Sequence, residues 1–335
     1  MSETAGERRG RLNPSVAQVR SAVANFLDAH PVPADALLLV AVSGGADSLA
    51  LAAATRFVAA ARGLRAAAVV VDHGLQSGSA EVAERAATQC RALGLSPVEV
   101  VSVVVGSEGG PEAAARDARY GALREAAARL GAALVLTGHT RNDQAETVLL
   151  GLARGSGPGS LRGMAPLDDG IGRPLLDVTR ETTRAAALAE GLEPWDDPHN
   201  DDERFSRVRV RHAVLPVLET ELGPGIVDAL ARTADLVRDD DEALDLLAAG
   251  MAHQVLAIEP VSFAAADVAS RPRALRTRII RIAADRAWGT TLSLSQTRAI
   301  DALLVDWHGQ GAVDVTGGSV VRHDGRVQFD RASED

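Results

Sequence analysis

The sequence contains no lysine, so all 35 of its basic residues are arginine. It has a single cysteine, Cys90, and aromatic residues make up only 3% of the chain. One cysteine excludes an internal disulfide framework and any metal site built from several thiolates. The missing lysine excludes the Walker phosphate-binding loop, which requires Gly-Lys-Ser or Gly-Lys-Thr. With so few aromatic residues, alanine, valine and leucine must fill the core.

Long apolar runs are also missing. No run approaches the roughly 18 residues that a membrane-spanning helix needs. Residues 1–11 are polar and lack the apolar core of a signal peptide. Together with the single cysteine, these features predict a cytoplasmic protein. The net charge of −10 argues against a general nucleic-acid coat protein, although a local basic patch remains compatible with it.

The length of 335 residues predicts two domains. We expect a disordered lead-in over 1–13, a first domain over 14–224, a connecting helix over 225–250 and a smaller C-terminal domain over 251–335. The C-terminal domain should be mainly helical and end in short β-hairpins, because glycine turn signals occur at 317–318 and 324–325.

Apolar runs alternate with helical patterns in the first domain. The predicted strands cover 36–42, 65–72, 98–105 and 133–137, and the predicted helices cover 15–29, 49–62, 79–93, 111–130 and 143–153. This alternation predicts an α/β fold with a doubly wound, mostly parallel sheet. Ligands of such sheets bind beyond the carboxyl ends of the strands, so Ser43, Asp72 and His139 should converge there.

A glycine-containing loop follows the first predicted strand and precedes a helix. It reads Ser43-Gly44-Gly45-Ala46-Asp47-Ser48. Its glycines allow close approach of the backbone to a ligand, and the helix that follows adds a positive N-terminal end. The loop therefore predicts a polyphosphate site. A dinucleotide site is excluded because it needs three spaced glycines. The alternative is a simple turn in which Ser43 or Asp47 caps the helix.

The second cluster comprises His139, Asp143 and Glu146. If this segment is helical, the spacings of four and three residues place all three on one face. Two carboxylates can hold an ammonium group, and one group can take the proton that makes the nitrogen nucleophilic. The alternative is a solvated helix face on which Asp143 is a cap.

The phosphate loop resembles the PP-loop of the N-type ATP pyrophosphatases, which split ATP between its α and β phosphates. Further motifs resemble those of the tRNA(Ile)-lysidine synthetases, in the same order and over about residues 37–215. These motifs are Asp72-His73-Gly74-Leu75, Glu112 to Tyr120, Gly138 to Thr147, Arg154-Gly155-Ser156-Gly157 and Arg173-Pro174-Leu175-Leu176.

The resemblance implies a PP-loop ATP pyrophosphatase domain, a C-terminal tRNA-recognition domain and a two-step ligation. ATP adenylates the C2 oxygen of the wobble cytidine in a CAU-anticodon tRNA(Ile). Free L-lysine then displaces AMP and forms lysidine. Mg²⁺ would accompany ATP, and a homodimer is compatible with the resemblance.

The resemblance also implies roles for individual residues. ATP would contact Ser43, Gly44, Gly45, Ala46, Asp47, Ser48, Asp72 and His73. Asp47, as the Mg²⁺ ligand, Arg116 and Arg119 would be catalytic, and His139, Asp143 and Glu146 would bind lysine. For Arg116 and Arg119 the alternative is an ordinary arginine-rich helix face.

Arginines near position 207 form a predicted tRNA patch, with Trp195 and Phe205 close by in the sequence. Its basic residues are Arg204, Arg207, Arg209 and Arg211, and the alternative is a solvated loop. His199 and Val208 depart from the family pattern, so we assign them no role. In the C-terminal domain, residues 271–286 hold six arginines and one acid. We expect Arg273 and Arg276 to contact tRNA there.

Three other functions compete with this interpretation. A PP-loop sulfur transferase generally needs paired cysteines, and an amidotransferase-type synthetase needs a glutaminase-like cysteine context that is not visible. A nucleotide-binding regulatory module without chemistry stays open, and it predicts that the carboxylates are dispensable.

Overall fold

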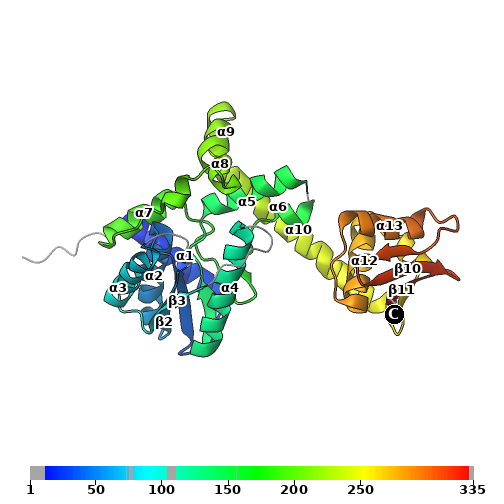
Figure 1. Ribbon diagram of the computed structural model, residues 1–335, viewed down its shortest axis with the longest axis horizontal. Helices are drawn as coiled ribbons and strands as arrows, with labels where there is room; N and C mark the ends of the chain where they lie inside the picture. Colours follow the sequence, from blue (N-terminus) through cyan, green and yellow to red (C-terminus); the bar gives the residue numbers. More distant parts are fainter. Residues whose placement is uncertain (1–11, 73, 75–77, 104–110, 156, 332–335) are drawn as a thin grey trace, which may run out of the picture. The chain divides into compact units, whose positions relative to one another are not determined.

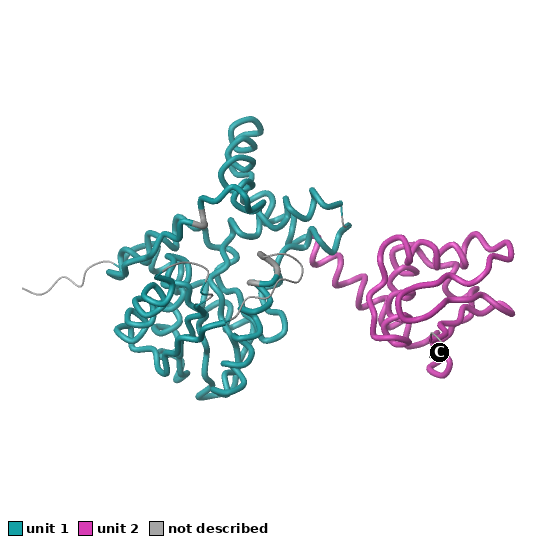
Figure 2. Tube along the Cα trace, in the orientation of Figure 1, with its two compact units in different colours: residues 1–236 teal, residues 237–335 magenta. Residues whose placement is uncertain are grey.

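The computed structural model describes residues 12–72, 74, 78–103, 111–155 and 157–331. The chain divides into two compact units, Met1–Leu236 and Val237–Asp335, and each is described by itself (Figure 2). Among the helices of the described residues, none is long and apolar enough to cross a membrane.

The first unit contains a six-stranded sheet in the order β3-β2-β1-β4-β6-β5. All neighbouring strands are parallel except β5, which pairs antiparallel with β6 at the edge. The strands are β1 (Leu37–Val42), β2 (Arg65–Asp72), β3 (Val98–Ser102), β4 (Ala132–Leu136), β5 (Leu167–Asp168) and β6 (Ile171–Gly172). The predicted doubly wound, mostly parallel sheet is confirmed.

The strand order reverses beside β1. The chain places β2 and β3 on one side of β1 and then crosses to place β4 on the other side. At such a point the connections leave in opposite directions, so a crevice opens at the carboxyl ends of the two strands. The predicted phosphate loop follows β1 at this crevice.

Alternating side chains of β1 supply both faces of the sheet. Leu38, Val40 and Val42 join one buried cluster, whereas Leu37 and Leu39 join another. The first cluster includes residues of four helices, α1 (Pro14–Ala29), α2 (Ala46–Ala61), α3 (Ser79–Ala92) and α7 (Arg180–Ala189). The second includes α4 (Pro111–Leu130), which covers the opposite face (Figure 1). Burial on both faces explains why these strands are nearly continuous apolar runs.

The remaining elements of the first unit form two groups. The helices α5 (Arg141–Arg154) and α6 (Pro158–Leu161) follow β4, and α7 is followed by η1 (Pro198–Asp201), α8 (Ser206–Arg209), the π-helical η2 (Val210–Val214) and α9 (Leu215–Glu221). A small apolar cluster joins Ala145 of α5 to Val210 and Leu215. The arginine segment predicted as a tRNA patch is therefore packed against the helix that carries Asp143 and Glu146.

Helix α10 (Ile226–Val255) begins in the first unit and ends in the second. The second unit has a five-stranded antiparallel sheet in the order β7-β8-β11-β10-β9. Its elements are β7 (Ala257–Ile258), β8 (Val261–Ala264), α11 (Ala265–Ala269), α12 (Arg273–Trp288), α13 (Leu294–Val305), β9 (Val313–Val315), β10 (Gly318–His323) and β11 (Arg326–Arg331). The two predicted turns join β9 to β10 and β10 to β11, whereas the short strands β7 and β8 gave no clear sequence signal.

Candidate active site

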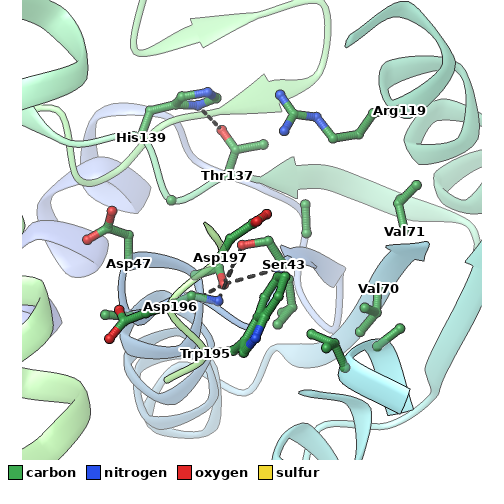
Figure 3. A pocket seen from close by; sticks show the side chains of 18 of the residues that line it. Ser43, Asp47, Val70, Val71, Arg119, Thr137, His139, Trp195, Asp196 and Asp197 are labelled. Carbon is green, nitrogen blue, oxygen red and sulfur yellow. Dashed lines mark hydrogen bonds between the residues drawn. The ribbon is translucent and has the colours of Figure 1, made fainter. Parts of the chain in front are cut away.

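A cavity of about 600 Å³ lies in the first unit at the carboxyl ends of β1, β2 and β4. Ser43, Asp72 and His139 all line it, so the structure brings together the three chain positions that the strand pattern predicted to converge. In Figure 3, His139 and Arg119 lie on one side of the cavity, and Ser43, Asp47 and Trp195 lie on the other. Apolar side chains of β2 and α3 complete its wall, including Val70 and Val82.

The phosphate loop is closed by the hydroxyl group of Ser48. The backbone N–H of Ser43 donates to Ser48 Oγ at 3.1 Å, and this hydroxyl donates to the carbonyl oxygen of Gly45 at 2.9 Å. Gly44 has a φ of +85°, a conformation that favours glycine. Helix α2 begins at Ala46, three residues earlier than predicted, so Asp47 and Ser48 lie in its positively polarised first turn.

Gly138 lets the end of β4 approach this turn. A Cβ atom at Gly138 would lie 3.0 Å from the carbonyl carbon of Asp47 and 3.0 Å from the backbone nitrogen of Ser48. A side chain at this position would push against the backbone of the phosphate loop, so glycine allows the close approach. The Gly138-His139 pair therefore positions the phosphate loop as well as the imidazole.

Asp47 is the acidic residue of the loop, and its side chain is 26% exposed. Thr183 Oγ1 donates a hydrogen bond to Asp47 Oδ1, and Arg180 Nε lies 3.7 Å from Oδ2. Burial raises the pKa of Asp47 to about 6, although the hydrogen bond from Thr183 opposes this shift. The ionised carboxylate is thus costly in this position, and a cation beside it would relieve that cost.

The segment after α7 crosses the phosphate loop. Trp195 N–H donates to the carbonyl oxygen of Gly44 at 2.9 Å. Gln89 of α3 makes two hydrogen bonds to the backbone of Glu193, at 2.8 and 3.2 Å. Trp195 lines the cavity, as do Arg207 and Arg211 of the predicted arginine patch.

Asp143 and Glu146 lie on the buried side of α5, with exposures of 8% and 0%. Asp143 Oδ2 accepts hydrogen bonds from the backbone N–H and the hydroxyl of Thr140, so it caps the helix from within the site. Burial alone would raise the pKa of Asp143, but Arg180 and the other polar neighbours lower it to about 2. Asp143 is therefore ionised throughout the physiological range.

Three guanidinium groups face these two carboxylates. Arg211 binds Glu146 through two hydrogen bonds of 2.7 and 3.1 Å. Arg180 binds Asp143 at 2.9 Å and Glu146 at 3.3 Å. Arg207 Nε lies 3.6 Å from Glu146. The sequence predicted Arg207 and Arg211 as tRNA contacts and did not indicate Arg180, because only the tertiary fold brings α7 and α8 to α5.

His139 precedes α5, which begins at Arg141 after its N-cap Thr140. The condition that would place His139 on one helix face with the two acids is therefore not met. His139 and Asp143 both line the cavity, whereas Glu146 is fully buried on α5. Burial lowers the pKa of His139 to about 3, so its imidazole is neutral. Its Nδ1 lies 2.9 Å from Thr137 Oγ1, which donates to the carbonyl oxygen of Gly172. When Thr137 gives its proton to Gly172, Nδ1 carries the imidazole proton and Nε2 is the nitrogen that can accept another.

Arg116 and Arg119 lie on α4 around Tyr120. Their guanidinium carbons are 4.9 and 5.4 Å from the centre of its ring, within the range of cation–π contact. Arg119 lines the cavity, where burial lowers its pKa, whereas Arg116 is exposed.

The remaining predicted residues are not among the described residues that line the cavity. His73 lies outside the described residues. Arg204 is 83% exposed and pairs with Asp202, and Arg209 donates to the carbonyl oxygen of Glu203. In the second unit Arg273 is exposed, whereas Arg276 pairs with Asp301 at 2.8 Å.

Two family descriptions match the chain. The family described as PP-loop domain matches residues 16–218, and the family described as TilS substrate binding domain matches residues 263–328. A solved structure, the U34-tRNA thiolase NcsA from Methanococcus maripaludis, resembles the fold with a TM-score of 0.57 at 16% sequence identity. It covers 67% of this chain and 80% of its own.

Curated relatives align over most of the chain. A tRNA(Ile)-lysidine synthase from Leifsonia xyli is 56% identical over 90% of this chain and 91% of its own length. The proteins of the same name from Thermobifida fusca and Streptomyces coelicolor are 54% and 52% identical, over 94% and 88% of this chain and 97% and 85% of their own lengths. Identity of this extent, together with both matching domains, leads to one conclusion: the chain belongs to the tRNA(Ile)-lysidine synthase family.

Proposed function

We propose that this protein ligates L-lysine to C2 of the wobble cytidine in the CAU anticodon of tRNA(Ile), with ATP as the energy source. The observation that carries the proposal is one cavity lined by the PP-loop, by the carboxylate Asp143 and by the neutral histidine His139. The second carboxylate, Glu146, is buried and is bound to Arg180 and Arg211, which line the same cavity. ATP cleavage needs the phosphate site and amine transfer needs the carboxylates and the histidine, and both groups must reach the same nucleobase, the wobble cytidine.

The first step is adenylation of the cytidine. The C2 oxygen attacks the α-phosphorus of ATP, the bond to the β-phosphate bridging oxygen breaks, and pyrophosphate leaves. Residues Ser43 to Ser48 would hold the leaving phosphates through their N–H groups and the end of α2. Arg119, with Arg116 behind it, would stabilise negative charge that develops in the transition state.

Mg²⁺ fits the PP-loop, with Asp47 as its protein ligand. The described residues hold no cluster of three or more acidic, histidine or cysteine side chains suited to a metal. Mg²⁺ commonly binds through one or two carboxylates together with substrate phosphates, so a lone carboxylate beside a phosphate cradle is sufficient. When bound, the ion would neutralise phosphate charge during the displacement.

The second step is transfer of lysine. The ε-amine attacks C2, the C2–O bond to the AMP group breaks, and AMP leaves. We propose that Asp143 and Glu146 bind the lysine ε-ammonium and that His139 Nε2 accepts the proton which this group must lose before its nitrogen attacks C2. A neutral imidazole with a free lone pair is in the correct state for this role.

The tRNA would contact exposed arginines. Arg204 and Arg209 remain accessible beside the cavity, whereas Arg207 and Arg211 face the carboxylates. In the second unit we propose Arg273 and Arg281 as tRNA contacts. Arg276, which the sequence also suggested, is no longer proposed because its guanidinium already pairs with Asp301. Homodimer formation and a cytoplasmic location stay predictions.

The decisive assay measures labelled lysine in a CAU-anticodon tRNA(Ile) transcript, with ATP and Mg²⁺, and scores AMP and pyrophosphate. We expect label in this transcript and none in the methionine tRNA that shares its anticodon. Pyrophosphate release with another acceptor would instead place the protein with a different PP-loop chemistry. Absence of ATP cleavage would favour a regulatory module.

Asp143→Asn tests the assigned role of the carboxylate pair. The amide can still accept hydrogen bonds from Thr140 but cannot pair with an ammonium group. We expect lysine incorporation to be lost while ATP binding survives. Full activity in this variant would refute the role.

A further inference from the structure

Arg180 contacts all three acidic groups of the candidate site. Its guanidinium lies 2.9 Å from Asp143, 3.3 Å from Glu146 and 3.7 Å from Asp47. The side chain is 28% exposed and lines the cavity. It therefore occupies the space between the PP-loop aspartate and the proposed lysine carboxylates, with one side open to ligands.

The backbone of Arg180 is fixed. It is the first residue of α7, which Thr179 caps by accepting a hydrogen bond from the N–H of Thr182. The N–H of Arg180 donates to Asn142 Oδ1 at 3.0 Å. Any rearrangement of Arg180 must therefore take place in its long side chain.

The two other arginines are held differently. Arg211 binds Glu146 through two hydrogen bonds and lies 3.8 Å from Asp143, and Arg207 also donates to Thr147 Oγ1 at 3.0 Å. Arg180 instead divides its contacts among three carboxylates and makes one hydrogen bond to each of Asp143 and Glu146. Among these three arginines, it is Arg180 that also lies beside Asp47, where ATP phosphates would bind.

Charge balance decides what lysine binding requires. Counted over direct contacts, the three acids Asp47, Asp143 and Glu146 are matched by three arginines, Arg180, Arg207 and Arg211. The other charged side chains that line the cavity lie outside this contact cluster; they are Asp72, Asp196, Asp197, Asp201, Arg119 and Arg184. An incoming ammonium would be a fourth cation at a buried site, where like charges repel strongly. Lysine can occupy the carboxylate pair favourably only if one arginine leaves it.

We propose that Arg180 occupies the ammonium subsite of the free enzyme and leaves it for the phosphates of bound nucleotide, so that lysine binds after ATP. This rests on the proposed function. The phosphates offer Arg180 a stronger partner than the shared carboxylates, since guanidinium–phosphate pairs form charge-assisted hydrogen bonds. Arg180 is then a positioning residue that enforces the order in which the two substrates bind.

Calorimetric binding of lysine to the full chain tests this order. The titration is run without nucleotide and with α,β-methylene ATP plus Mg²⁺. For the unmodified protein we expect about tenfold tighter lysine binding with nucleotide, a typical coupling between two sites. In Arg180→Met, lysine should bind without nucleotide, and the nucleotide effect should fall below about threefold.

Two further variants separate charge from structure. Arg180→Lys keeps a cation at the subsite and should restore part of the nucleotide dependence. Arg180→Gln keeps hydrogen-bond donors without the charge and should behave like Arg180→Met, which it replaces if the methionine variant does not fold. Arg20→Met is the matched control, because it removes a partly buried arginine that pairs with Glu190 at the other end of α7. Its nucleotide dependence should equal that of the unmodified protein.

The proposal is overturned if nucleotide does not change lysine affinity in the unmodified protein, or if the uncharged variants keep the full dependence. Either result with intact lysine incorporation into tRNA would leave the proposed function standing. Loss of incorporation in the unmodified protein would instead overturn the function itself.

Discussion

The ionised carboxylate of Asp47 lowers the stability of the folded protein. Its carboxylate lies at the start of α2, where the helix end favours negative charge, yet burial still raises its pKa to about 6. Thr183 and Arg180 compensate only part of the lost hydration. The residue that we assign to Mg²⁺ is therefore destabilised in the free enzyme and stabilised by the ligand it awaits.

This cost predicts that Asp47→Asn stabilises the free protein at alkaline pH. A folded-state pKa of about 6, above the unfolded value of 3.8, makes stability fall as pH rises between these two values, because the carboxyl ionises first in the unfolded chain. The amide never ionises, so the variant escapes this loss. We expect it to gain about 1–2 kcal/mol at pH 8 and almost nothing at about pH 3, as measured by thermal unfolding at both pH values.

The control for this experiment is Asp28→Asn, which removes a mostly exposed carboxylate paired with Arg62. It should leave the unfolding temperature nearly unchanged at both pH values. An Asp47→Asn protein that melts at or below the temperature of the unmodified protein at pH 8 would contradict the assigned cost.

A variant of His139 can separate the two proposed chemical steps. Its neutral imidazole contacts Thr137, and we propose that it acts in lysine transfer, whereas adenylation would use the PP-loop. We expect His139→Asn to slow lysine transfer by about 10²- to 10⁴-fold, because asparagine cannot take a proton, while pyrophosphate release changes little. Single-turnover measurements of both products check this. Equal slowing of both steps would assign His139 to nucleotide binding instead.

At the scale of elements, the parallel sheet could be predicted because its strands are buried on both faces. Apolar runs such as Ala67–Val70 in β2 and the strand β1 have no polar alternation to obscure them. The start of α2 was placed too late, since Ala46 gives no capping signal. The two-residue strands β5 and β6 were missed because they are too short to show a period.

The site could be predicted only in part for a related reason. Ser43, Asp72 and His139 follow strands, and parallel topology brings strand ends together. Arg180 reaches the acids from a helix that shows no functional spacing in the sequence, so its role depends on tertiary contacts alone. The same contacts divert Arg207 and Arg211 from the predicted tRNA patch to Glu146.

Because Gly138, just after β4, lies against the start of α2, adding one methyl group there should lower both stability and ATP affinity. In Gly138→Ala the added Cβ meets backbone atoms of Asp47 and Ser48 at 3.0 Å, so the phosphate loop must move. We expect a loss of about 1–3 kcal/mol in stability and at least tenfold weaker ATP binding, measured by denaturant unfolding and calorimetry.

Gly121→Ala is the matched control. Gly121 lies inside α4, where a Cβ would meet no atom within 4 Å. Alanine should stabilise that helix by up to about 1 kcal/mol and leave ATP binding unchanged. Similar ATP affinities in the two variants would show that close approach at Gly138 is not what shapes the phosphate loop.

At the scale of the whole molecule, an acidic protein must bind an anionic RNA. The net charge of −10 is unevenly distributed, because α12 and the turn before it carry six arginines and one acid. Two of these arginines are used internally, Arg276 by Asp301 and Arg278 by Asp241 and Asp245. Arg273 and Arg281 are exposed, and among the described residues the side chain of neither has a hydrogen bond or an ion pair.

Because some arginines of α12 are exposed and others are paired with acids, we expect substitutions of the former to affect tRNA binding and substitutions of the latter to affect folding stability. The double variant Arg273→Ala with Arg281→Ala should weaken tRNA binding at low salt and reduce the slope of log affinity against log salt by about 1–2, since each phosphate contact releases about one counterion. Arg276→Ala should instead lower the unfolding temperature, because it leaves Asp301 buried without its partner, and keep the salt slope.

The control, Arg65→Ala with Arg129→Ala, removes the same charge from surface ion pairs with Asp35 and Glu99. If this control flattens the slope as much as the α12 pair, total charge rather than α12 determines RNA binding.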